Sequence, residues 1–454
     1  DGVLCTNGYS SSPVCSPSRA SLLTGRFATR FGFEFTPTTS SMMKAVSLFS
    51  KKNEVADGIY YNEREENIID IEQMGLPQSE KTIAEMLKPE GYHNIHIGKW
   101  HLGHANDFLP RKHGFDESLR IDQGSLFLPE DDKNVINAKL EFDPIDKVLW
   151  GNLPYAVNFN EGPRMNPDGH LTDYLTNEAV KVIEKNKNRP FFLYLAYWAV
   201  HSPLQAKKED YEKLSFIENH DERVLASMVM TVDRGVGKIR DVLKKNNIDD
   251  NTIIIFTSDN GAPGYIGLPD LNKPYRGWKL THFEGGVHVP FIVSYPNKIP
   301  KGTTYNGRVS NLDILSTVAS IAGVDINRND LKEIEFDGVN VLPYLIGENE
   351  GEPQRVLFNK SGNYSFIIKE GWKLQVDLVQ NKKWLYNLKE DPTEQINLIK
   401  SDLEKLNELE KILNKKLSEQ VKPIWPSLLD WPIFIDKTLD EIVNKNDEYI
   451  FWAN

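Results

Sequence analysis

One segment of this 454-residue chain combines a thiol, a predicted helix start and a cation. Residues 13–26 read PVCSPSRASLLTGR. Pro17 suits the first turn of a helix and Gly25 suits its end, so Cys15 is predicted at the helix N-terminus. Unpaired amides and the helix dipole attract an anion there, and Arg19 adds a positive charge one turn later. For a bare Cys and Arg, the alternative is a structural cysteine at a strand-to-helix turn.

A second segment, residues 91–104, reads GYHNIHIGKWHLGH and follows a short predicted helix. Residues 93–97 are predicted as a short strand. Lys99 and His101 alternate with Trp100, so their side chains point the same way if the loop is extended. The simpler interpretation is two surface polar residues after a strand.

Polar side chains also follow two predicted buried strands. His201 comes directly after the apolar run 189–200, and Asp259 and Asn260 lie near the end of the run 252–261. In α/β sheets the chemistry gathers at the C-terminal ends of strands. A single His at a strand end is usually structural, however, and an Asp-Asn-Gly sequence is more often a turn.

The elements that must position these residues follow from hydrophobic periodicity. One apolar stripe, spaced 3, 4, 4, 3 and 4 residues apart, predicts a helix packed on a sheet. Its members are Leu225, Met228, Val232, Val236, Ile239 and Leu243. Residues 290–296 are a third predicted buried strand. Apolar strands separated by helices predict an α/β sheet covered on both faces.

The composition changes near residues 343–352, which are rich in Gly, Pro and charge and predict a boundary. Four short strand-like runs follow and predict a small antiparallel sheet. An amphipathic helix comes next. Its predicted apolar face consists of Leu403, Leu406, Leu409, Leu413 and Leu417. Residues 35–79 are polar and irregular, and we expect a loop-rich insertion there.

Composition and charge exclude several classes of protein. The chain is 40% hydrophobic and 26% charged, which is ordinary for a soluble globular protein. No apolar stretch approaches the roughly 18 to 20 residues of a membrane helix, so no membrane span is expected. A net charge of −12 argues against nucleic acid as a partner. Two cysteines cannot build a disulfide framework.

Taken whole, C-x-P-S-R followed by L-L-T-G-R closely resembles the signature of type I, formylglycine-dependent sulfatases of the alkaline-phosphatase-like superfamily. The segment GYHNIHIGKWH resembles a second sulfatase signature, and YWAVHSP and SDNG resemble two further family motifs. Lys279 matches the family lysine that precedes E-G-G-x-R-x-P, although His288 stands where the family usually has Arg. The resemblance covers nearly the whole chain, except residues 35–79 and 117–160.

The resemblance implies an α/β fold with an alkaline-phosphatase-like mixed sheet sandwiched by helices. It also implies a small C-terminal α+β subdomain with an antiparallel sheet. We expect the catalytic domain at residues 1–345 and the subdomain at 346–454. Sulfatases begin with a strand that ends in paired aspartates, and this strand has no counterpart before Cys15. We therefore expect the catalytic domain to lack its first strand, leaving Asp259 exposed and neighbouring strands with unpaired backbone groups.

The resemblance further implies two cofactor requirements. A formylglycine-generating or equivalent maturation enzyme would convert Cys15 to formylglycine. One Ca²⁺ or Mg²⁺ ion would be bound by Asp259, Asn260 and the modified Cys15, because such ions prefer oxygen ligands. The catalytic residues carried over are Cys15, Arg19, Lys99, His101, His201 and Lys279.

Each carried-over residue has an implied role. Arg19, Lys99 and Lys279 would balance the sulfate charge. His201, assisted by Lys279, would protonate the leaving oxygen. His101 would take the proton from the second hydroxyl of the hydrated formylglycine. That step releases sulfate and regenerates the aldehyde.

These matches predict a sulfuric ester hydrolase, periplasmic or secreted, acting on a sulfated carbohydrate such as algal polysaccharide or glycosaminoglycan fragments. One alternative is a phosphonate or phosphodiester hydrolase of the same superfamily. The other is a catalytically dead homologue that binds sulfated glycans. Trp425, Trp431 and Trp452 are candidates for stacking on sugar rings, although packing in the core is the commoner role.

Overall fold

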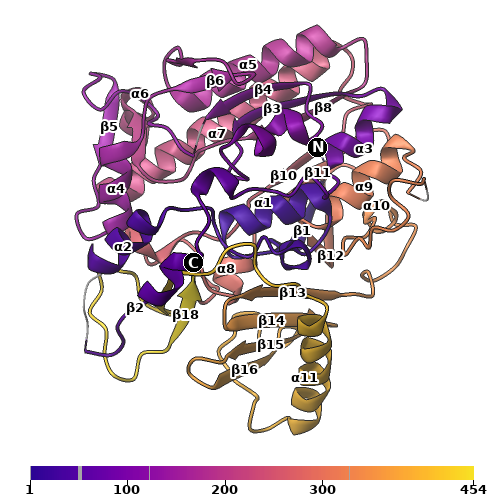
Figure 1. Ribbon diagram of the computed structural model, residues 1–454. Coiled ribbons are helices and arrows are strands. Elements are labelled where there is room, and N and C mark those ends of the chain that lie inside the picture. The colour runs from indigo at the N-terminus through magenta and orange to yellow at the C-terminus, as the bar shows by residue number, and fades with distance from the viewer. Residues whose placement is uncertain (1, 50–53, 122, 327) are drawn as a thin grey trace. The chain divides into compact units, whose positions relative to one another are not determined.

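The computed structural model describes residues 2–49, 54–121, 123–326 and 328–454. The chain divides into two compact units, whose segments can be followed by colour in Figure 1. The first unit comprises Asp1–Glu80, Ile254–Ser294 and Lys298–Asn454. The second comprises Lys81–Ile253 and Tyr295–Asn297. The domain boundary expected at residues 345 and 346 stays a prediction.

The first unit contains a four-stranded mixed sheet in the order β10–β11–β1–β12. Its strands are β1 (Val3–Tyr9), β10 (Ile254–Thr257), β11 (Phe291–Ser294) and β12 (Thr303–Ser310). β1 pairs antiparallel with β11 and parallel with β12. Along β1, buried Val3 and Cys5 alternate with exposed Leu4, as expected for a strand covered on one face. Helix α1 (Cys15–Thr24) follows β1 and contacts α9 (Asp313–Ala322).

The sequence predicts β10 as a buried strand, and this prediction is wrong because the strand is only partly buried. It lies at the edge of its sheet, and β11 is its sole strand partner within the described ranges. Ile254 and Ile255 are half-buried and Phe256 is 36% exposed. The Asp259 side chain, just beyond this edge, is 20% exposed. A strand at the edge of a sheet has backbone N–H and C=O groups on its outer side that are not paired with a neighbouring strand.

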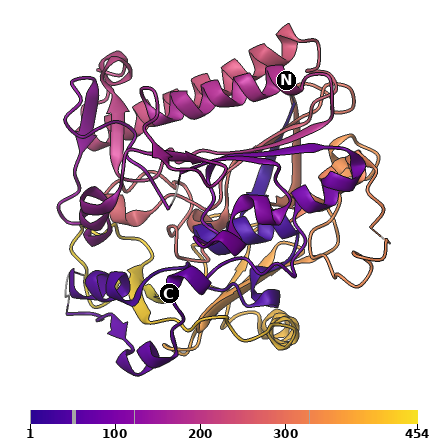
Figure 2. The same cartoon turned by 45° about the horizontal axis from the view of Figure 1, so that its top comes forward.

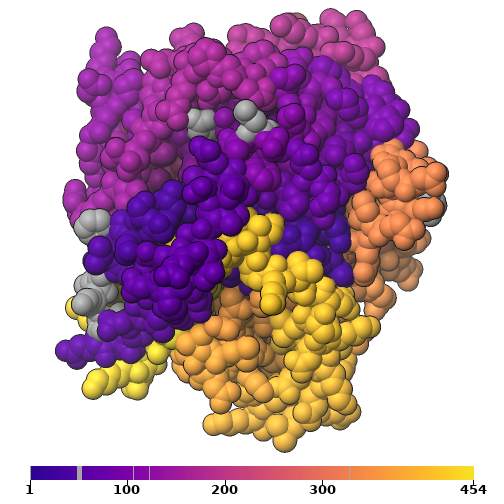
Figure 3. All heavy atoms as spheres, viewed as in Figure 1, coloured from indigo at the N-terminus to yellow at the C-terminus, as the bar shows by residue number. Residues whose placement is uncertain are grey.

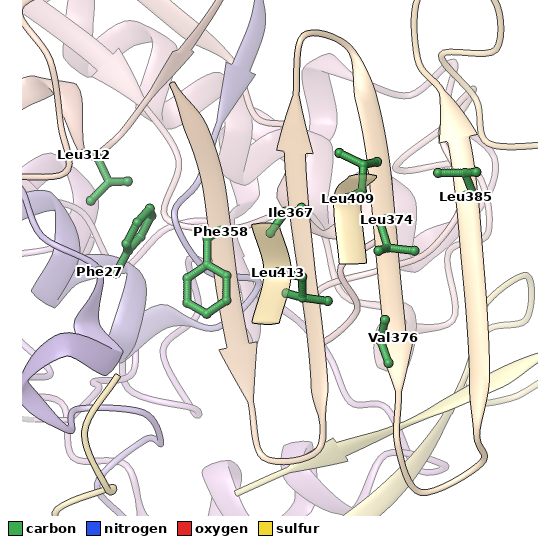
Figure 4. Packing of buried hydrophobic residues seen from close by; sticks show 9 residues of the cluster. All are labelled: Phe27, Leu312, Phe358, Ile367, Leu374, Val376, Leu385, Leu409 and Leu413. Carbon is green, nitrogen blue, oxygen red and sulfur yellow. The ribbon is translucent and has the colours of Figure 1, made fainter. Parts of the chain in front are cut away.

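The C-terminal antiparallel sheet and its helix are confirmed. The sheet joins β13 (Val356–Ser361), β14 (Tyr364–Lys369), β15 (Trp372–Asp377) and β16 (Lys382–Asn387) in sequence order. Helix α11 (Leu403–Ser418) packs on it through buried Leu409 and Leu413, which Figure 4 shows among side chains from the sheet. Leu403, predicted on the apolar face, is 61% exposed because it lies at the first residue of the helix.

A third sheet of the first unit joins distant parts of the chain. Its order is β18 (Tyr449–Ala453), β17 (Leu429–Phe434) and β2 (Ile59–Tyr60). Ser361 Oγ donates to the Ala453 carbonyl at 3.3 Å. Figure 3 shows yellow atoms from late in the chain next to the orange ones. The expected insertion at residues 35–79 contains helix α2 (Ser40–Phe49) and short 3₁₀ turns, while residues 50–53 lie outside the described residues.

The second unit contains a five-stranded mixed sheet, so the expected α/β architecture is present as two mixed sheets, one in each unit. Its strands, in sheet order, are β7 (Arg164–Met165), β6 (Val157–Phe159), β4 (Glu117–Ile121), β3 (His93–Lys99) and β8 (Phe191–Ala196). Helices α5 (Leu171–Asn186) and α7 (His220–Lys245) run side by side and, in Figures 1 and 2, lie along this sheet. α7 is the helix predicted from periodicity, with Met228 and Leu243 fully buried.

Shorter elements complete the two units. The remaining strands, β5 (Val135–Ala138) and β9 (Leu204–Lys207), pair antiparallel. The remaining α-helices are α3 (Ile83–Leu87), α4 (Pro144–Asn152), α6 (Lys208–Lys213), α8 (Glu284–Val287) and α10 (Leu342–Leu345). Within the residues that the structure describes, no helix combines the length and the apolar character needed to cross a membrane.

Candidate active site

Cys15 is the first residue of helix α1, as the sequence predicts. Val14 is the N-cap, and its carbonyl accepts from the Ser18 amide at 3.1 Å. Gly25 closes the helix in the left-handed region, with φ of 64°, and its N–H donates to the Ser21 carbonyl. Cys15 is 4% exposed and forms no disulfide. The thiol therefore lies where helix amides stabilise negative charge.

Arg19 lies one turn further along α1 and forms an ion pair with Asp259. Arg19 Nε donates to Asp259 Oδ2 at 2.8 Å, and both side chains are largely buried. A charge-assisted bond in a buried place holds both groups in fixed positions. The structure thus brings together two residues that the sequence placed in separate motifs.

Two glycine-containing motifs bring Asp259 and Asn260 close to the segment after Lys279. The Gly261 N–H donates to the Gly286 carbonyl at 2.9 Å. A side chain at Gly261 would meet the Gly285 carbonyl oxygen at 1.9 Å, so only glycine permits this approach. The backbones of residues 259–261 and 284–286 are therefore in direct contact.

Asn260 has the character of a cation ligand. Its Nδ2 donates to the Gly261 carbonyl at 2.9 Å, whereas Oδ1 is buried and accepts no hydrogen bond within the described part of the chain. A buried acceptor of this kind is costly unless a cation or donor satisfies it. With the Asp259 carboxylate it provides two oxygen ligands, which fit part of a Ca²⁺ or Mg²⁺ site. The described residues contain no cluster of three or more His, Cys, Asp or Glu side chains able to hold a metal.

Lys279 lies on a loop that contacts the start of α1. The backbone N–H of Leu280 donates to the Pro13 carbonyl at 3.0 Å, and Lys279 Nζ donates to the Tyr265 hydroxyl at 2.9 Å. Burial by itself lowers the pKa of the Lys279 ammonium. The charges of Cys15 and Tyr265 outweigh that effect, so the pKa lies above its usual value. Lys279 is therefore a buried permanent cation in the electrostatic field of Cys15.

Three predicted site residues belong to the second unit. Lys99 is the last residue of β3, and its Nζ lies 4.6 Å from the ring centroid of Trp198. The same indole stacks on His201, with ring centroids 4.4 Å apart. His201 Nδ1 lies 2.8 Å from the Ser202 carbonyl, which can only accept, so Nδ1 carries the proton. His201 Nε2 is then the atom at which a transferable proton is gained or lost.

The extended backbone expected for Lys99 to His101 is wrong. Lys99 still belongs to β3, whereas His101 has φ of 62°, in the left-handed region. Alternation along an extended chain therefore does not decide where His101 points. A non-glycine residue in this conformation is uncommon and is often found at functional sites.

His288 replaces the family arginine and lies among aromatic rings. Its Nε2 donates to the Thr6 carbonyl at 2.9 Å, and its ring centroid is 4.5 Å from Tyr275 and 5.2 Å from Tyr9. It lies near buried Glu284, whose pKa burial raises, whereas the charge of Lys373 and further interactions together lower it by more, so that the pKa lies below its usual value. His288 is therefore held by one backbone carbonyl and two tyrosine rings.

Sequence reasoning missed Tyr265 and Trp198, the residues that contact the two lysines. Trp198 stands three residues before His201 inside a recognised motif, and this proximity was an available signal. Tyr265 lies in a 3₁₀ turn, Gly264–Ile266, fourteen residues before Lys279, and no pattern in the sequence marks it.

Comparison with known proteins identifies the protein family to which this chain belongs. A family model described as Sulfatase matches residues 1–324, and one described as N-sulphoglucosamine sulphohydrolase, C-terminal, matches residues 277–423. The chain belongs to the sulfatase family, and its fold is the alkaline-phosphatase-like fold.

Individual relatives agree with this assignment. N-acetylgalactosamine-6-sulfatase from Homo sapiens is 33% identical over 350 residues, covering 76% of this chain and 59% of that protein. The chain spans about three fifths of the length of the first curated relatives that it matches.

Solved structures are similar over most of the chain. The crystal structure of Ps i-CgsB in complex with k-i-k-neocarrahexaose has a TM-score of 0.75 and 29% identity, covering 93% of this chain and 86% of that one. The phosphonate monoester hydrolase of Agrobacterium radiobacter has a TM-score of 0.59 and 16% identity, covering 93% of this chain and 90% of that one, and shows likeness of fold alone.

Proposed function

We propose that this protein hydrolyses sulfate monoesters of carbohydrates. The observation that carries the proposal is the group around the start of α1, where the Arg19–Asp259 ion pair and the buried cation Lys279 accompany Cys15. Membership of the sulfatase family supports it, as do relatives whose names include sugar sulfatases. The net reaction converts a sulfate ester and water into an alcohol and sulfate.

We assign Cys15 as the residue that a maturation enzyme converts to formylglycine. The hydrated aldehyde would supply one hydroxyl to attack sulfur and a second whose deprotonation allows sulfate to leave. A Ca²⁺ or Mg²⁺ ion held by Asp259 and Asn260 would add positive charge beside the attacking oxygen. The buried acceptor of Asn260 supports this assignment.

The remaining roles are proposed from the chemistry of each side chain. Arg19, Lys99 and Lys279 would hold sulfate oxygens and neutralise charge that grows in the transition state. His201, whose Nδ1–H is held by a carbonyl, would deliver a proton from Nε2 to the leaving oxygen, with help from Lys279. His101 would serve as the base. The proposed localisation is periplasmic or secreted, as the family resemblance suggests.

The test is turnover by matured protein on a panel of defined sulfated oligosaccharides, with an aryl sulfate and an aryl phosphonate measured in parallel. We expect release of inorganic sulfate from at least one sulfated sugar, and a larger kcat/KM for the aryl sulfate than for the aryl phosphonate. A preference for the phosphonate would favour the alternative hydrolase. Binding without turnover by fully matured protein would favour a dead homologue.

A further inference from the structure

The indole of Trp198 contacts two side chains to which the proposed function gives roles, Lys99 and His201. The Lys99 ammonium lies 4.6 Å from the ring centroid, and the His201 imidazole stacks on the indole with ring centroids 4.4 Å apart and an angle of 26° between the planes. Trp198 and Lys99 are almost completely buried. Attraction between a cation and an aromatic face is stronger where water is excluded. A single ring therefore contacts both a proposed sulfate-binding cation and the proposed acid.

The pairing of two strands of the second unit brings Lys99 and Trp198 together. β3 pairs parallel with β8, and Gly98 lies opposite Ala196 in this register. A Cβ atom at Gly98 would lie 2.0 Å from the Ala196 carbonyl oxygen, so the two strands approach each other closely there. Lys99 comes directly after Gly98, and Trp198 stands two residues after Ala196. Both side chains therefore come from the same edge of the sheet, where the parallel strands end.

A turn brings His201 onto the same indole. The His201 N–H donates to the Trp198 carbonyl at 3.0 Å, which closes a turn over residues 198–201. Strand β9 begins three residues later, at Leu204. The stack of His201 on Trp198 is therefore built locally, whereas the contact of Lys99 with Trp198 depends on the sheet.

Packing holds the indole at its far edge. Trp198 Nε1 is buried and has no hydrogen-bond acceptor among the described residues, so no such bond orients the ring. A Cβ atom at Gly124 would lie 2.9 Å from both Cζ2 and Cη2 of Trp198 and 3.0 Å from Leu153 Cδ2. Carbon atoms do not approach that closely without displacement, so a side chain at this position would push the indole. Gly124 therefore leaves the space that the ring occupies.

We propose that Trp198 is a positioning residue for sulfate ester hydrolysis, whose indole holds the Lys99 ammonium and the His201 imidazole in fixed positions relative to each other. The inference rests on the proposed function, which assigns sulfate binding to Lys99 and proton delivery to His201. Both side chains have further contacts besides the indole. Loss of the indole should therefore misplace the two groups slightly and leave both in the site, and a misplacement of about 1 Å can cost about 100-fold in rate.

Three variants and one control test this role. Trp198→Leu removes the aromatic ring, and Trp198→Phe keeps a smaller ring that can still stack. Gly124→Ala pushes the indole without changing any of the three side chains, so it decides the outcome if Trp198→Leu folds poorly. Gly237→Ala is the matched control, because it makes the same substitution in α7, where an added Cβ atom would meet no other group of the described chain within 4 Å.

The stack is measured without turnover, by NMR of the full chain isotopically labelled at histidine. The signal of His201 is identified by its loss in His201→Gln. We expect the ring protons of His201 to resonate upfield in the wild type and in Gly237→Ala, because they lie in the ring current of the indole. In Trp198→Leu and Gly124→Ala these signals should move downfield. Equal His201 shifts in the wild type and in both of these variants would overturn the inference, whatever the activity of the protein.

The link to Lys99 is measured by a double-mutant cycle on the same signal. Lys99→Met removes the ammonium that lies on the indole. We expect it to move the His201 signal in the wild type by at least about twice the shift that it causes in Trp198→Leu, because the indole transmits the change. Equal shifts in the two backgrounds would show that the indole does not link Lys99 to His201.

The consequence for catalysis is measured with two substrates that differ in leaving group. An alkoxide leaving from a sugar needs a proton, whereas nitrophenolate leaves without one, so misplacement of His201 affects a sugar sulfate more. In Trp198→Leu and Gly124→Ala we expect kcat/KM to fall about 30-fold for a sugar sulfate and about threefold for nitrophenyl sulfate. Trp198→Phe should lie between these variants and the wild type, and Gly237→Ala should keep both values.

A loss of folded protein would lower both values of kcat/KM by the same factor. Equal losses for the two substrates, or no loss in either Trp198→Leu or Gly124→Ala, would therefore overturn the positioning role. If matured wild-type protein hydrolyses neither substrate, the proposed function fails, and the NMR measurements decide separately whether the indole holds Lys99 and His201 together.

Discussion

Arg19 Nε donates to Asp259 Oδ2 at 2.8 Å, although 240 residues separate the two in sequence. The bond joins the second turn of α1 to the loop that follows β10. One partner belongs to the helix that begins at Cys15, and the other is a proposed ligand of the divalent cation. The ion pair therefore couples the position of the nucleophile's helix to the position of the cation site.

Replacing Asp259 tests this coupling. Asp259→Asn keeps the shape of the side chain but removes the charge that Arg19 meets. We expect a loss in kcat/KM of at least about 100-fold for a sulfate ester, because charge stabilisation at such sites contributes that much. Asp270→Asn is the control, since Asp270 is an exposed partner of Lys273. Equal activity of the two variants would contradict the role of Asp259.

Cys15 and Cys5 are both buried thiols, and we expect only Cys15 to take part in the reaction. Burial, with the charge of Asp313, raises the pKa of the Cys5 thiol to about 12, so it stays protonated and inert. Cys15→Ala should lower kcat by at least about 1,000-fold, as removal of a nucleophile does. Cys5→Ala should keep full activity, and mass spectrometry should find formylglycine only at residue 15. Undiminished turnover in Cys15→Ala would eliminate the proposed mechanism.

Asn260 predicts a cation effect that can be measured without activity. If Asn260 Oδ1 binds Ca²⁺ or Mg²⁺, added cation stabilises the folded protein by mass action. We expect Tm of the wild type to rise with cation concentration and to fall back with chelator, while Asn260→Ala shows less than half of the rise. Asn251→Ala, at an exposed position, should respond like the wild type. The assignment fails if Asn260→Ala keeps the full rise.

A buried charge cluster predicts a pH dependence of stability. Lys373 Nζ lies 2.8 Å from Glu284 Oε1 and 3.0 Å from Glu394 Oε1, and all three side chains are almost completely buried. Tyr9 donates to Glu284, and Gln375 donates to Glu394. Burial, and then the charge of Glu284, raises the pKa of Glu394 to about 7 against the attraction of Lys373.

The sign of the effect follows from that raised pKa. Glu394 binds a proton more tightly in the folded chain, so its contribution to stability is present at low pH and is lost as pH rises through about 7. We expect the free energy of unfolding to decrease by about 3 kcal/mol between about pH 5 and pH 8. Glu394→Gln should flatten this slope, whereas exposed Glu390→Gln should not. A slope that is the same in both variants would assign the pH dependence to other groups.

Local patterns predicted a large part of the fold. The start of α1 at Cys15, its end at Gly25 and the helix α7 depend on residues within a few positions of each other, and all three are as predicted. The C-terminal hairpins are equally local, because each strand of that sheet pairs with its neighbour in sequence. Family motifs added the identities of the candidate catalytic residues.

Long-range packing decided the rest. β10 is as apolar as a core strand, yet its exposure depends on which strands pair with it, and no window of sequence contains that information. The contact of Tyr265 with Lys279 depends on a turn and a loop whose course local preferences do not fix. The contact of Trp198 with Lys99 depends on the pairing of β8 with β3, two strands that lie far apart in the sequence. Residue types therefore determined which chemistry is possible, and the tertiary structure decided which side chains surround it, because burial and charge depend on neighbours that are close only in the folded chain.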